Sequence, residues 1–403
     1  MENTIFNFHD IILLTTTYQS ILFAVLIFAI KHDRKSDFFL IGFLLTQAAI
    51  PLHILINYGE EFRFIALEIS PNLYNFFDIA YWLEGPLLLF YTRSLVYKDY
   101  SLKKTDLLYA LPVALYLIYT SITFYTVDSA TKISLLHDYQ TINASLLNHS
   151  IGFLREGLRV MFSVLCIIEI HRCRQQIRNR YSSLEKVDLG WLNFLVIGFL
   201  FVRIWACLVS VAIILSSHTG ININFNAMGL LGNYCTLGLV SALIYFGIRH
   251  SSIFEGIENS LLSKKVEHTH EIDTEKVSAI EDHMRTHKPY LANILTLEQL
   301  ANQLGMQPRS LSTIINRHFK RNFFEFINEY RIKEAKLQLA DPKHKSTTII
   351  EIMTNSGFNS KATFNTFFKK NVGSTPSQYR ASQHNNNANT KKETKPQLDQ
   401  EPN

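Results

Sequence analysis

Residues 348–380 contain a stretch whose side chains could contact DNA. Apolar side chains recur along it at helical spacing and define one face, made of Phe364, Phe367, Phe368 and Val372. The opposite face carries polar and basic side chains, namely Lys361, Asn365, Thr366 and Lys369. Asparagine can pair bidentately with adenine, and lysine can neutralise phosphate. The spacing therefore predicts a helix that packs by one face and contacts a nucleic acid by the other.

The same pattern occurs 52 residues earlier in the chain. The matching residues are Leu297, Leu300, Ala301 and Gly305 in the first copy and Ile349, Ile352, Met353 and Gly357 in the second. Each glycine falls where a tight turn would join two helices, so the repeat predicts two helix-turn-helix units.

The second helix of each unit is the expected recognition helix. In the first unit this helix would open at Pro308, pack through Leu311, Ile314, Ile315 and Phe319, and expose Arg309, Ser312, Thr313, Asn316 and Lys320. In the second unit, Asn359 or Ser360 would cap the helix. The constant offset makes Lys361 the equivalent of Arg309.

One long helix is predicted between the two units, over residues 323–340. Its apolar positions include Phe323, Phe326, Ile327, Tyr330 and Leu337, and Asp341-Pro342 would end it. Such a helix would hold the recognition helices in successive major grooves, roughly 34 Å apart. Residues 286–381 hold 14 Lys plus Arg against 6 Asp plus Glu, a net charge of +8 that suits salt-sensitive phosphate contact.

A short amphipathic helix is expected just before these units, because Val277, Ile280 and Met284 recur at helical spacing. The sequence leaves open whether this helix packs on the same domain or pairs with its copy in a homodimer. The polar segment 249–274 is expected to be a juxtamembrane linker, and the Asn-rich segment 382–403 a disordered tail.

Residues 275–381 resemble the DNA-binding domain of the AraC/XylS family of bacterial transcription regulators. The resemblance is carried by Leu297-Glu298-Gln299-Leu300-Ala301, by Phe326-Ile327-Asn328-Glu329-Tyr330-Arg331-Ile332 with Ala335, and by Gly357-Phe358, Phe364, Phe367-Phe368-Lys369-Lys370, Gly373, Thr375-Pro376 and Tyr379-Arg380. It covers about a quarter of the chain. It implies a seven-helix module with two helix-turn-helix units, sequence-specific binding of double-stranded DNA, and RNA polymerase as a partner.

The resemblance also implies which side chains contact DNA. Carried over by position, base contacts fall to Arg309, Ser312 and Thr313, with Asn316 on the same face, and to Lys361, Ala362, Asn365 and Thr366, while Lys369 and Lys370 lie nearer the phosphates. Arginine can pair bidentately with guanine. Because Ala362 and Thr366 stand where a long polar side chain would be expected, the second unit is expected to contribute less to sequence selection.

The first 248 residues are predicted to be a membrane domain. Seven apolar runs are long enough to span a bilayer, which requires about 20 residues per helix. They are residues 11–30, 38–57, 73–92, 107–127, 151–170, 189–215 and 227–248. The loops after runs one, three and five hold 12 Lys plus Arg, against two in the N-terminal segment and the other loops. This asymmetry predicts an N-terminus outside the bacterial inner membrane and a DNA-binding domain in the cytoplasm.

Several ionisable residues interrupt the predicted spans. Glu84, Arg159 and Arg203 fall near the expected bilayer midplane, and Asp78, Arg155 and Glu156 form a layer nearer the outer face. Charges at this depth cost a few kcal/mol or more each unless they are paired or hydrated. They indicate either interhelical ion pairs that fix the packing or a site for a signal, such as an anionic or polar small molecule.

The remaining motifs exclude several classes of protein. Cys166, Cys173, Cys207 and Cys235 show no paired spacing, so neither a disulfide framework nor a zinc site is indicated. The chain carries no phosphate-binding loop and no nucleophile elbow. We therefore expect no cofactor and no enzymatic activity.

The fold class expected is all-α: a seven-helix transmembrane bundle followed by a cytoplasmic double helix-turn-helix domain. The preferred function is a membrane-embedded transcription regulator controlled by a signal, a small molecule or a membrane protein, that the bundle senses. Two alternatives stay open, a transporter-like or enzymatic membrane domain fused to a DNA-binding module, and a passive membrane anchor or docking surface.

Overall fold

The computed structural model describes residues 7–29, 35–97, 100–137, 146–183, 189–219, 225–250 and 274–383. Most of the expected linker, residues 251–273, and the expected tail beyond residue 383 lie outside these ranges. Within them the regular secondary structure is helical, apart from isolated bridge residues, which include the antiparallel pair of Tyr181 and Thr296. The all-α prediction is therefore confirmed.

The chain forms two compact units. The N-terminal unit comprises residues 1–173 and 189–263, and the C-terminal unit comprises residues 174–188 and 264–403. The C-terminal unit thus includes a short segment that begins within the last turns of the helix Leu146–Arg178 and lies far from the rest of this unit in the sequence. The sequence had placed this segment in a loop of the membrane domain.

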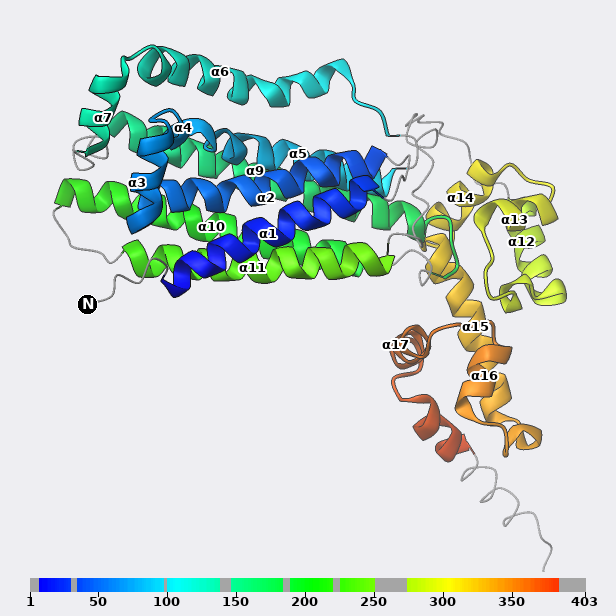
Figure 1. Ribbon diagram of the computed structural model, residues 1–403. Coiled ribbons are helices and arrows are strands. Elements are labelled where there is room, and N and C mark those ends of the chain that lie inside the picture. Colours follow the sequence, from blue (N-terminus) through cyan, green and yellow to red (C-terminus); the bar gives the residue numbers. More distant parts are fainter. Residues whose placement is uncertain are drawn as a thin grey trace, which may run out of the picture. The chain divides into compact units, whose positions relative to one another are not determined.

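The N-terminal unit consists of helices of very different lengths (Figure 1). They are α1 (Phe8–Ala29), α2 (Lys35–Tyr58), α3 (Glu60–Ile69), α4 (Leu73–Phe76), α5 (Ile79–Val96), η1 (Lys104–Ala110), α6 (Leu111–Thr120), η2 (Ser121–Tyr125), α7 (Ser129–His137), α9 (Leu146–Arg178), α10 (Gly190–Thr219) and α11 (Phe225–His250). The seven predicted apolar runs overlap these helices, and the run at residues 73–92 is divided between α4 and α5. Among the described residues, five helical stretches are long and apolar enough to cross a membrane: α1, α2, Lys104–Tyr125, and most of α10 and of α11.

This unit buries charges and exposes apolar side chains. Helix α2 packs between α1 and α5, α1 also contacts α11, and α11 packs on α10. In their midst Glu84 and Arg203 are only 1% and 2% exposed. On the outside, Phe28 is 79% and Leu107 is 73% exposed. This distribution is the reverse of the usual one for a protein in water, and it suits an apolar surrounding.

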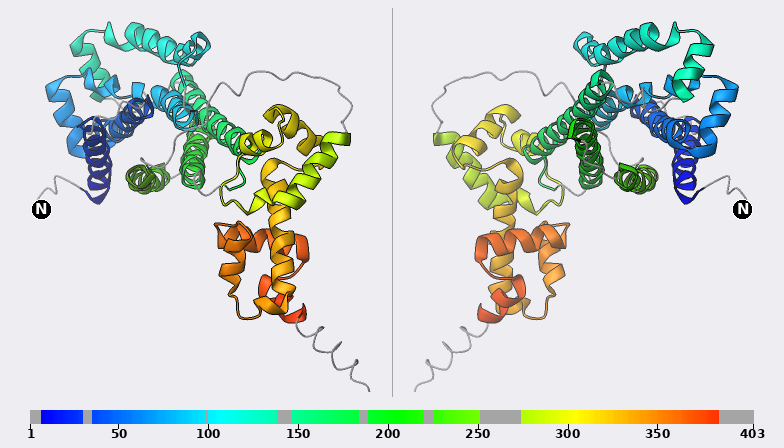
Figure 2. Two further views of the ribbon diagram at one scale, coloured as in Figure 1. Left: turned by 90° about the vertical axis from the view of Figure 1, so that its right-hand side faces the viewer. Right: turned by 90° about the vertical axis from the view of Figure 1, so that its left-hand side faces the viewer.

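The C-terminal unit contains shorter helices arranged along one long one (Figure 2). They are α12 (Thr274–His287), η5 (Pro289–Leu291), α13 (Leu297–Gln303), α14 (Pro308–Arg317), α15 (Phe323–Ala340), η6 (Pro342–His344), α16 (Ile349–Asn355) and α17 (Lys361–Val372). Residues 376–383 are also helical, which completes the seven α-helices that the family resemblance implies. Helix α15 has the bounds predicted from the sequence.

The long helix α15 joins two separate hydrophobic cores. Its first half contributes Phe323, Phe326 and Ile327 to a core with α12, η5, α13 and α14. Its second half contributes Ile332, Ala335 and Leu339 to a core with α16 and α17. One helix therefore carries both helix-turn-helix units, because its apolar positions serve one unit in each half. Leu337, one of the apolar positions named for this helix, is 68% exposed and belongs to neither core.

Helix α12 packs within its own unit. Val277, Ile280 and Met284 are all buried, and they belong to the core formed by α13 and α14. Of the two possibilities that the sequence left open for this amphipathic helix, the structure shows packing on the same domain, because the apolar face is covered there.

Candidate nucleic-acid interface and buried ion cluster

Helix α14 turns its polar face to solvent. Leu311, Ile314 and Ile315 are buried in the first core, and Phe319 packs against it. On the opposite side Arg309, Thr313 and Asn316 are exposed and Ser312 is half-buried. The Thr313 hydroxyl donates to the carbonyl of Arg309 at 2.9 Å, and the Asn316 amide donates to the carbonyl of Ser312 at 2.8 Å. The four predicted contact residues of the first unit therefore share one helix surface.

Helix α17 has the same two-faced construction. Phe364 and Phe368 are buried, and Phe367 and Val372 pack at the edge of the second core. Lys361, Ala362, Asn365, Thr366, Lys369 and Lys370 are all exposed. Ser360 caps the helix, since its hydroxyl accepts from the amide of Thr363 at 3.3 Å. The structure thus chooses Ser360 over Asn359, whose side chain donates to the carbonyl of Asn293 instead.

The turn inside the second unit is one residue longer than that of the first. Two residues separate Gly305 from the start of α14, whereas three separate Gly357 from the start of α17. Counted from the beginning of each helix, Arg309 therefore corresponds to Ala362. The equivalence of Arg309 and Lys361, which a constant offset predicted, is wrong for this reason.

Gly357 occupies a position where another residue would not fit. Its φ of +87° lies in the left-handed region, and a Cβ atom there would lie 2.5 Å from the carbonyl oxygen of Tyr290. The same Cβ would approach Nε of Arg331 to 3.0 Å. The turn of the second unit is therefore packed tightly against the loop that precedes the first unit.

Arg331 of α15 lies where the two helix-turn-helix units of the C-terminal unit meet. Its side chain is 1% exposed and donates to the carbonyl oxygens of Tyr290 and Ala292, each at 2.7 Å. The guanidinium carbon lies 5.8 Å from the ring centre of Phe358 in the turn of the second unit. Burial lowers the pKa of Arg331 to about 10, so the group remains charged at neutral pH.

The first helix of each unit begins with a reciprocal cap. In α13 the Thr296 hydroxyl accepts from the amide of Gln299, whose side chain accepts from the amide of Thr296. In α16 Thr348 and Glu351 make the same pair of bonds, at 3.1 and 2.8 Å. The hydrogen bond from the Thr348 amide lowers the pKa of Glu351. The two caps differ in that only the second contains a titratable group.

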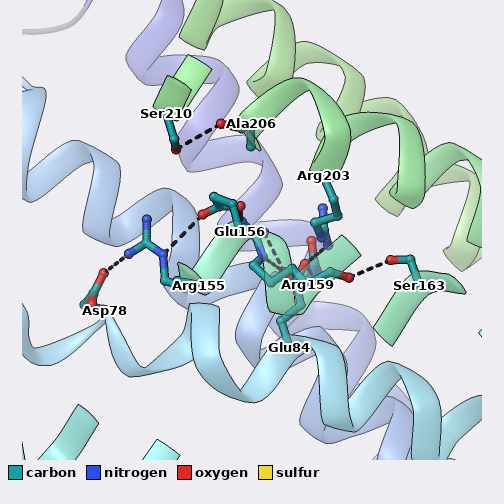
Figure 3. Close-up of polar contacts among 10 residues, drawn as sticks. Asp78, Glu84, Arg155, Glu156, Arg159, Ser163, Arg203, Ala206 and Ser210 are labelled. Carbon is teal, nitrogen blue, oxygen red and sulfur yellow. Dashed lines mark hydrogen bonds and ion pairs between the residues drawn. The ribbon is translucent and has the colours of Figure 1, made fainter. Parts of the chain in front are cut away.

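The six charged residues predicted within the membrane spans form one cluster in the N-terminal unit (Figure 3). Glu84 of α5 pairs with Arg159 of α9 at 2.5 Å and also with Arg203 of α10. Arg159 also pairs with Glu156 on the same helix. Three carboxylates and three guanidinium groups thus share their contacts, and the formal charges balance.

Asp78 and Arg155 extend the cluster toward one end of α5. Arg155 donates to Asp78 at 2.6 Å and to Glu156 at 3.2 Å. The guanidinium carbon of Arg155 lies 4.1 Å from the ring centre of Tyr81. The adjoining cavity is about 10 Å³ in volume, enough for roughly one water molecule. The arrangement therefore favours interhelical ion pairs over an open ligand pocket.

Sequence reasoning missed two polar members of this cluster. Gln47 of α2 is 1% exposed and donates to Glu84 at 2.5 Å, and His53 lies 3.6 Å from Asp78. Both stand inside an apolar run, and a polar residue in such a run was the available signal. They add α2 to the helices that the cluster connects.

The comparison with known protein families gives a match within the C-terminal unit. Residues 300–382 match the sequence model of a helix-turn-helix domain. Three relatives are uncharacterized HTH-type transcriptional regulators of Staphylococcus aureus, from strains COL, MSSA476 and N315. Each is 31% identical over 109 residues, which is 27% of this chain and 14% of the relative. The chain thus matches only a small part of these relatives. No solved structure matches it.

The family match coincides with the repeated units. The matched residues include the end of α13 and all of α14 to α17, together with the helix at residues 376–383. The C-terminal part of this chain therefore contains an AraC-type helix-turn-helix domain, which makes the protein similar to DNA-binding transcription regulators.

Proposed function

We propose that this protein is a membrane-embedded, one-component transcription regulator. The observation that carries the proposal is the combination, in one chain, of an AraC-type domain and a helical unit with charges inside and apolar side chains outside. The AraC-type domain would bind DNA, and the helical unit would be embedded in the lipid bilayer. A regulator of this kind would be multi-pass in the bacterial inner membrane and would not act as an enzyme.

The proposed DNA contacts follow from the exposed faces of α14 and α17. Arg309 lies in the first turn of α14, where a guanidinium can pair with the O6 and N7 atoms of guanine. Asn365 is the corresponding candidate for adenine on α17. Lys369 and Lys370, in the last turn of α17, are suited to phosphate. RNA polymerase is the proposed partner once the protein is bound to its site.

The proposed topology has seven spans with the N-terminus outside. Beyond the five most apolar stretches, α5 and α9 supply the remaining two. These are the helices that carry Glu84, Glu156 and Arg159, all of them buried. Charged side chains that pair inside a bundle are compatible with a span. The positively charged loops support a cytoplasmic C-terminal unit in this topology.

We propose that the ion cluster first of all holds the helices of the bundle together. Glu84 touches Gln47, Arg159 and Arg203, so one carboxylate connects α2, α5, α9 and α10. A signal that acted at Asp78, Glu84, Arg155, Glu156, Arg159 and Arg203 would have to compete with these pairs. We therefore keep these six residues as the proposed signal site, at which a signal would act by breaking ion pairs between the helices.

The test uses the full-length protein in lipid nanodiscs and selects DNA from a random pool. The expected result is a site with two conserved stretches separated by about one helical turn, roughly 34 Å. The matched variants are Arg309→Ala and Arg285→Ala, the latter changing an exposed arginine on α12. Selection should weaken only with Arg309→Ala. Absence of any sequence preference at low salt would contradict the proposal.

The two alternatives need a separate measurement. Replacement of residues 1–248 by an unrelated multi-span anchor keeps the C-terminal unit at the membrane. A passive anchor predicts unchanged transcription of the target genes after this replacement. A sensing bundle predicts that regulation becomes constitutive or is lost.

A further inference from the structure

A short stretch of chain after α9 is built into the DNA-binding unit. Helix α9 ends at Arg178, and residues 178–182, here called the α9 extension, belong to the same compact unit as the helix-turn-helix domain. In the sequence this stretch lies between α9 and α10, almost 100 residues before α12. It is therefore a contact separate from the covalent linker at residues 251–273.

The α9 extension pairs with the backbone at the start of α13. Tyr181 faces Thr296 in an antiparallel bridge. The Ser182 amide donates to the carbonyl of Leu295 at 3.1 Å, and the Leu297 amide donates to the carbonyl of Arg180 at 2.9 Å. Leu297 is the first residue of α13, and an amide at that position has no partner within its own helix. The extension supplies that partner.

Ser182 also completes the surroundings of two buried side chains on α15. It is 1% exposed, and its carbonyl accepts from Arg331 at 3.2 Å and from Asn328 at 3.3 Å. Its hydroxyl oxygen lies 3.2 Å from Arg331 and accepts from the Leu295 amide at 3.0 Å. Asn328 and Arg331 are 0% and 1% exposed. Without the extension, several buried donors would lose an acceptor, which destabilises the folded unit.

Two ion pairs flank this contact. Arg178 lies 2.9 Å from Glu325 in the first turn of α15, and Arg180 lies 4.0 Å from Glu298 in the first turn of α13. The extension therefore contacts the two helices that position the first recognition helix. Its charge complements theirs.

We propose that the α9 extension is an intramolecular ligand of the first helix-turn-helix unit, and that its docking holds this unit in the DNA-binding state. The proposal rests on the proposed function and specifies how the DNA-binding site is regulated. Because α9 also carries Arg155, Glu156 and Arg159, a change in the ion cluster can reach the unit through this helix. The linker then serves as a tether, and the extension transmits the signal.

The first test asks whether docking is needed for DNA binding. In the full-length protein in nanodiscs, Ser182→Ala should weaken affinity for the selected DNA site about tenfold, because buried donors lose an acceptor. The matched control is Ser183→Ala, at a neighbour that makes none of these contacts, and it should leave affinity unchanged. Equal affinity of both variants and the unaltered protein would overturn the proposal.

A second variant tests docking without relying on a destabilised protein. Tyr181 and Thr296 are the non-hydrogen-bonded pair of the bridge, whose Cα atoms lie about 4.5 Å apart, within the range for a disulfide. Tyr181→Cys with Thr296→Cys, added to Ser182→Ala, should restore DNA affinity when oxidised and lose it again on reduction. Tyr181→Cys with Gln303→Cys, about 10 Å further along α13, should not cross-link.

The possible failures can be told apart. A cross-link within one chain, found by mass spectrometry, supports docking in cis, whereas a cross-linked dimer overturns it in favour of exchange between copies. Identical affinities of the oxidised and reduced protein overturn the regulatory role. If Arg309→Ala abolishes sequence selection in the same preparation, the proposed function stands even when the docking proposal fails.

Discussion

The two helix-turn-helix units begin alike and are supported differently. Helices α13 and α16 have equal length, the same kind of cap and a left-handed glycine after them. The first unit packs against α12, η5 and the α9 extension. The second packs against the end of α15 and Tyr379 of the last helix. The repeat therefore specifies the local turn, whereas the neighbours decide how firmly each recognition helix is held.

The largest expected effect comes from the residue that serves both units. Arg331→Met removes the side-chain donor to the carbonyls of Tyr290 and Ala292 and one of the two side-chain donors to the carbonyl of Ser182. We expect the C-terminal unit to lose more than about 3 kcal/mol of stability. The matched control is Lys333→Met, an exposed position on the same helix. Amide hydrogen exchange of the full chain should show lost protection around residues 290–297 and around Gly357. Loss confined to one region would mean that Arg331 supports only one unit.

The next largest effect is expected from substitutions of DNA-contacting residues, which should differ between the two helix-turn-helix units. We expect Arg309→Ala to cost about 1–3 kcal/mol of affinity for the selected site and to relax sequence preference in one half-site. Lys361→Ala should cost less and mainly lower the salt dependence of binding, because Ala362 occupies the position that corresponds to Arg309. Binding isotherms at several salt concentrations measure both. A larger effect of Lys361→Ala would reverse the ranking of the two units.

The two helix caps give a smaller, paired effect. Thr296→Ala and Thr348→Ala each remove a hydroxyl acceptor, which costs about 1 kcal/mol. Helix α13 keeps a second bond at its first turn, from Leu297 to the carbonyl of Arg180. We therefore expect Thr348→Ala to open α16 more than Thr296→Ala opens α13, as measured by local hydrogen exchange. The opposite order would show that the α9 extension adds nothing to α13.

Acid should produce the smallest difference. The pKa of Glu351 is lowered from 4.5 in the folded unit, so its cap stabilises α16 above that value and the contribution is lost as pH falls through the folded pKa. Gln299 in the corresponding cap does not titrate. Hydrogen exchange at decreasing pH, corrected for intrinsic rates, should show α16 loosening before α13. Glu351→Gln should remove this difference.

Much of the C-terminal unit was predictable because its signals are local. The bounds of α15 followed from apolar spacing and from Asp341-Pro342, and the cap of α17 was narrowed to Asn359 or Ser360. The prediction failed where a neighbour at a distance mattered. Leu337 satisfies the apolar pattern yet lies beyond both cores, and the extra residue before α17 shifts a register that a constant offset could not reveal.

By itself, the sequence determined the all-α class, the doubled helix-turn-helix pattern and the presence of charged residues within apolar runs. These properties depend on residues within a turn or two of one another. Only the tertiary structure decided that Glu84 meets Gln47, Arg159 and Arg203, and that Arg331 is completed by Ser182 from a different part of the chain. The physical reason is that a buried charge is stable only with partners close by in space. Which residues come close depends on the path of the whole backbone, and a short sequence pattern does not contain that information.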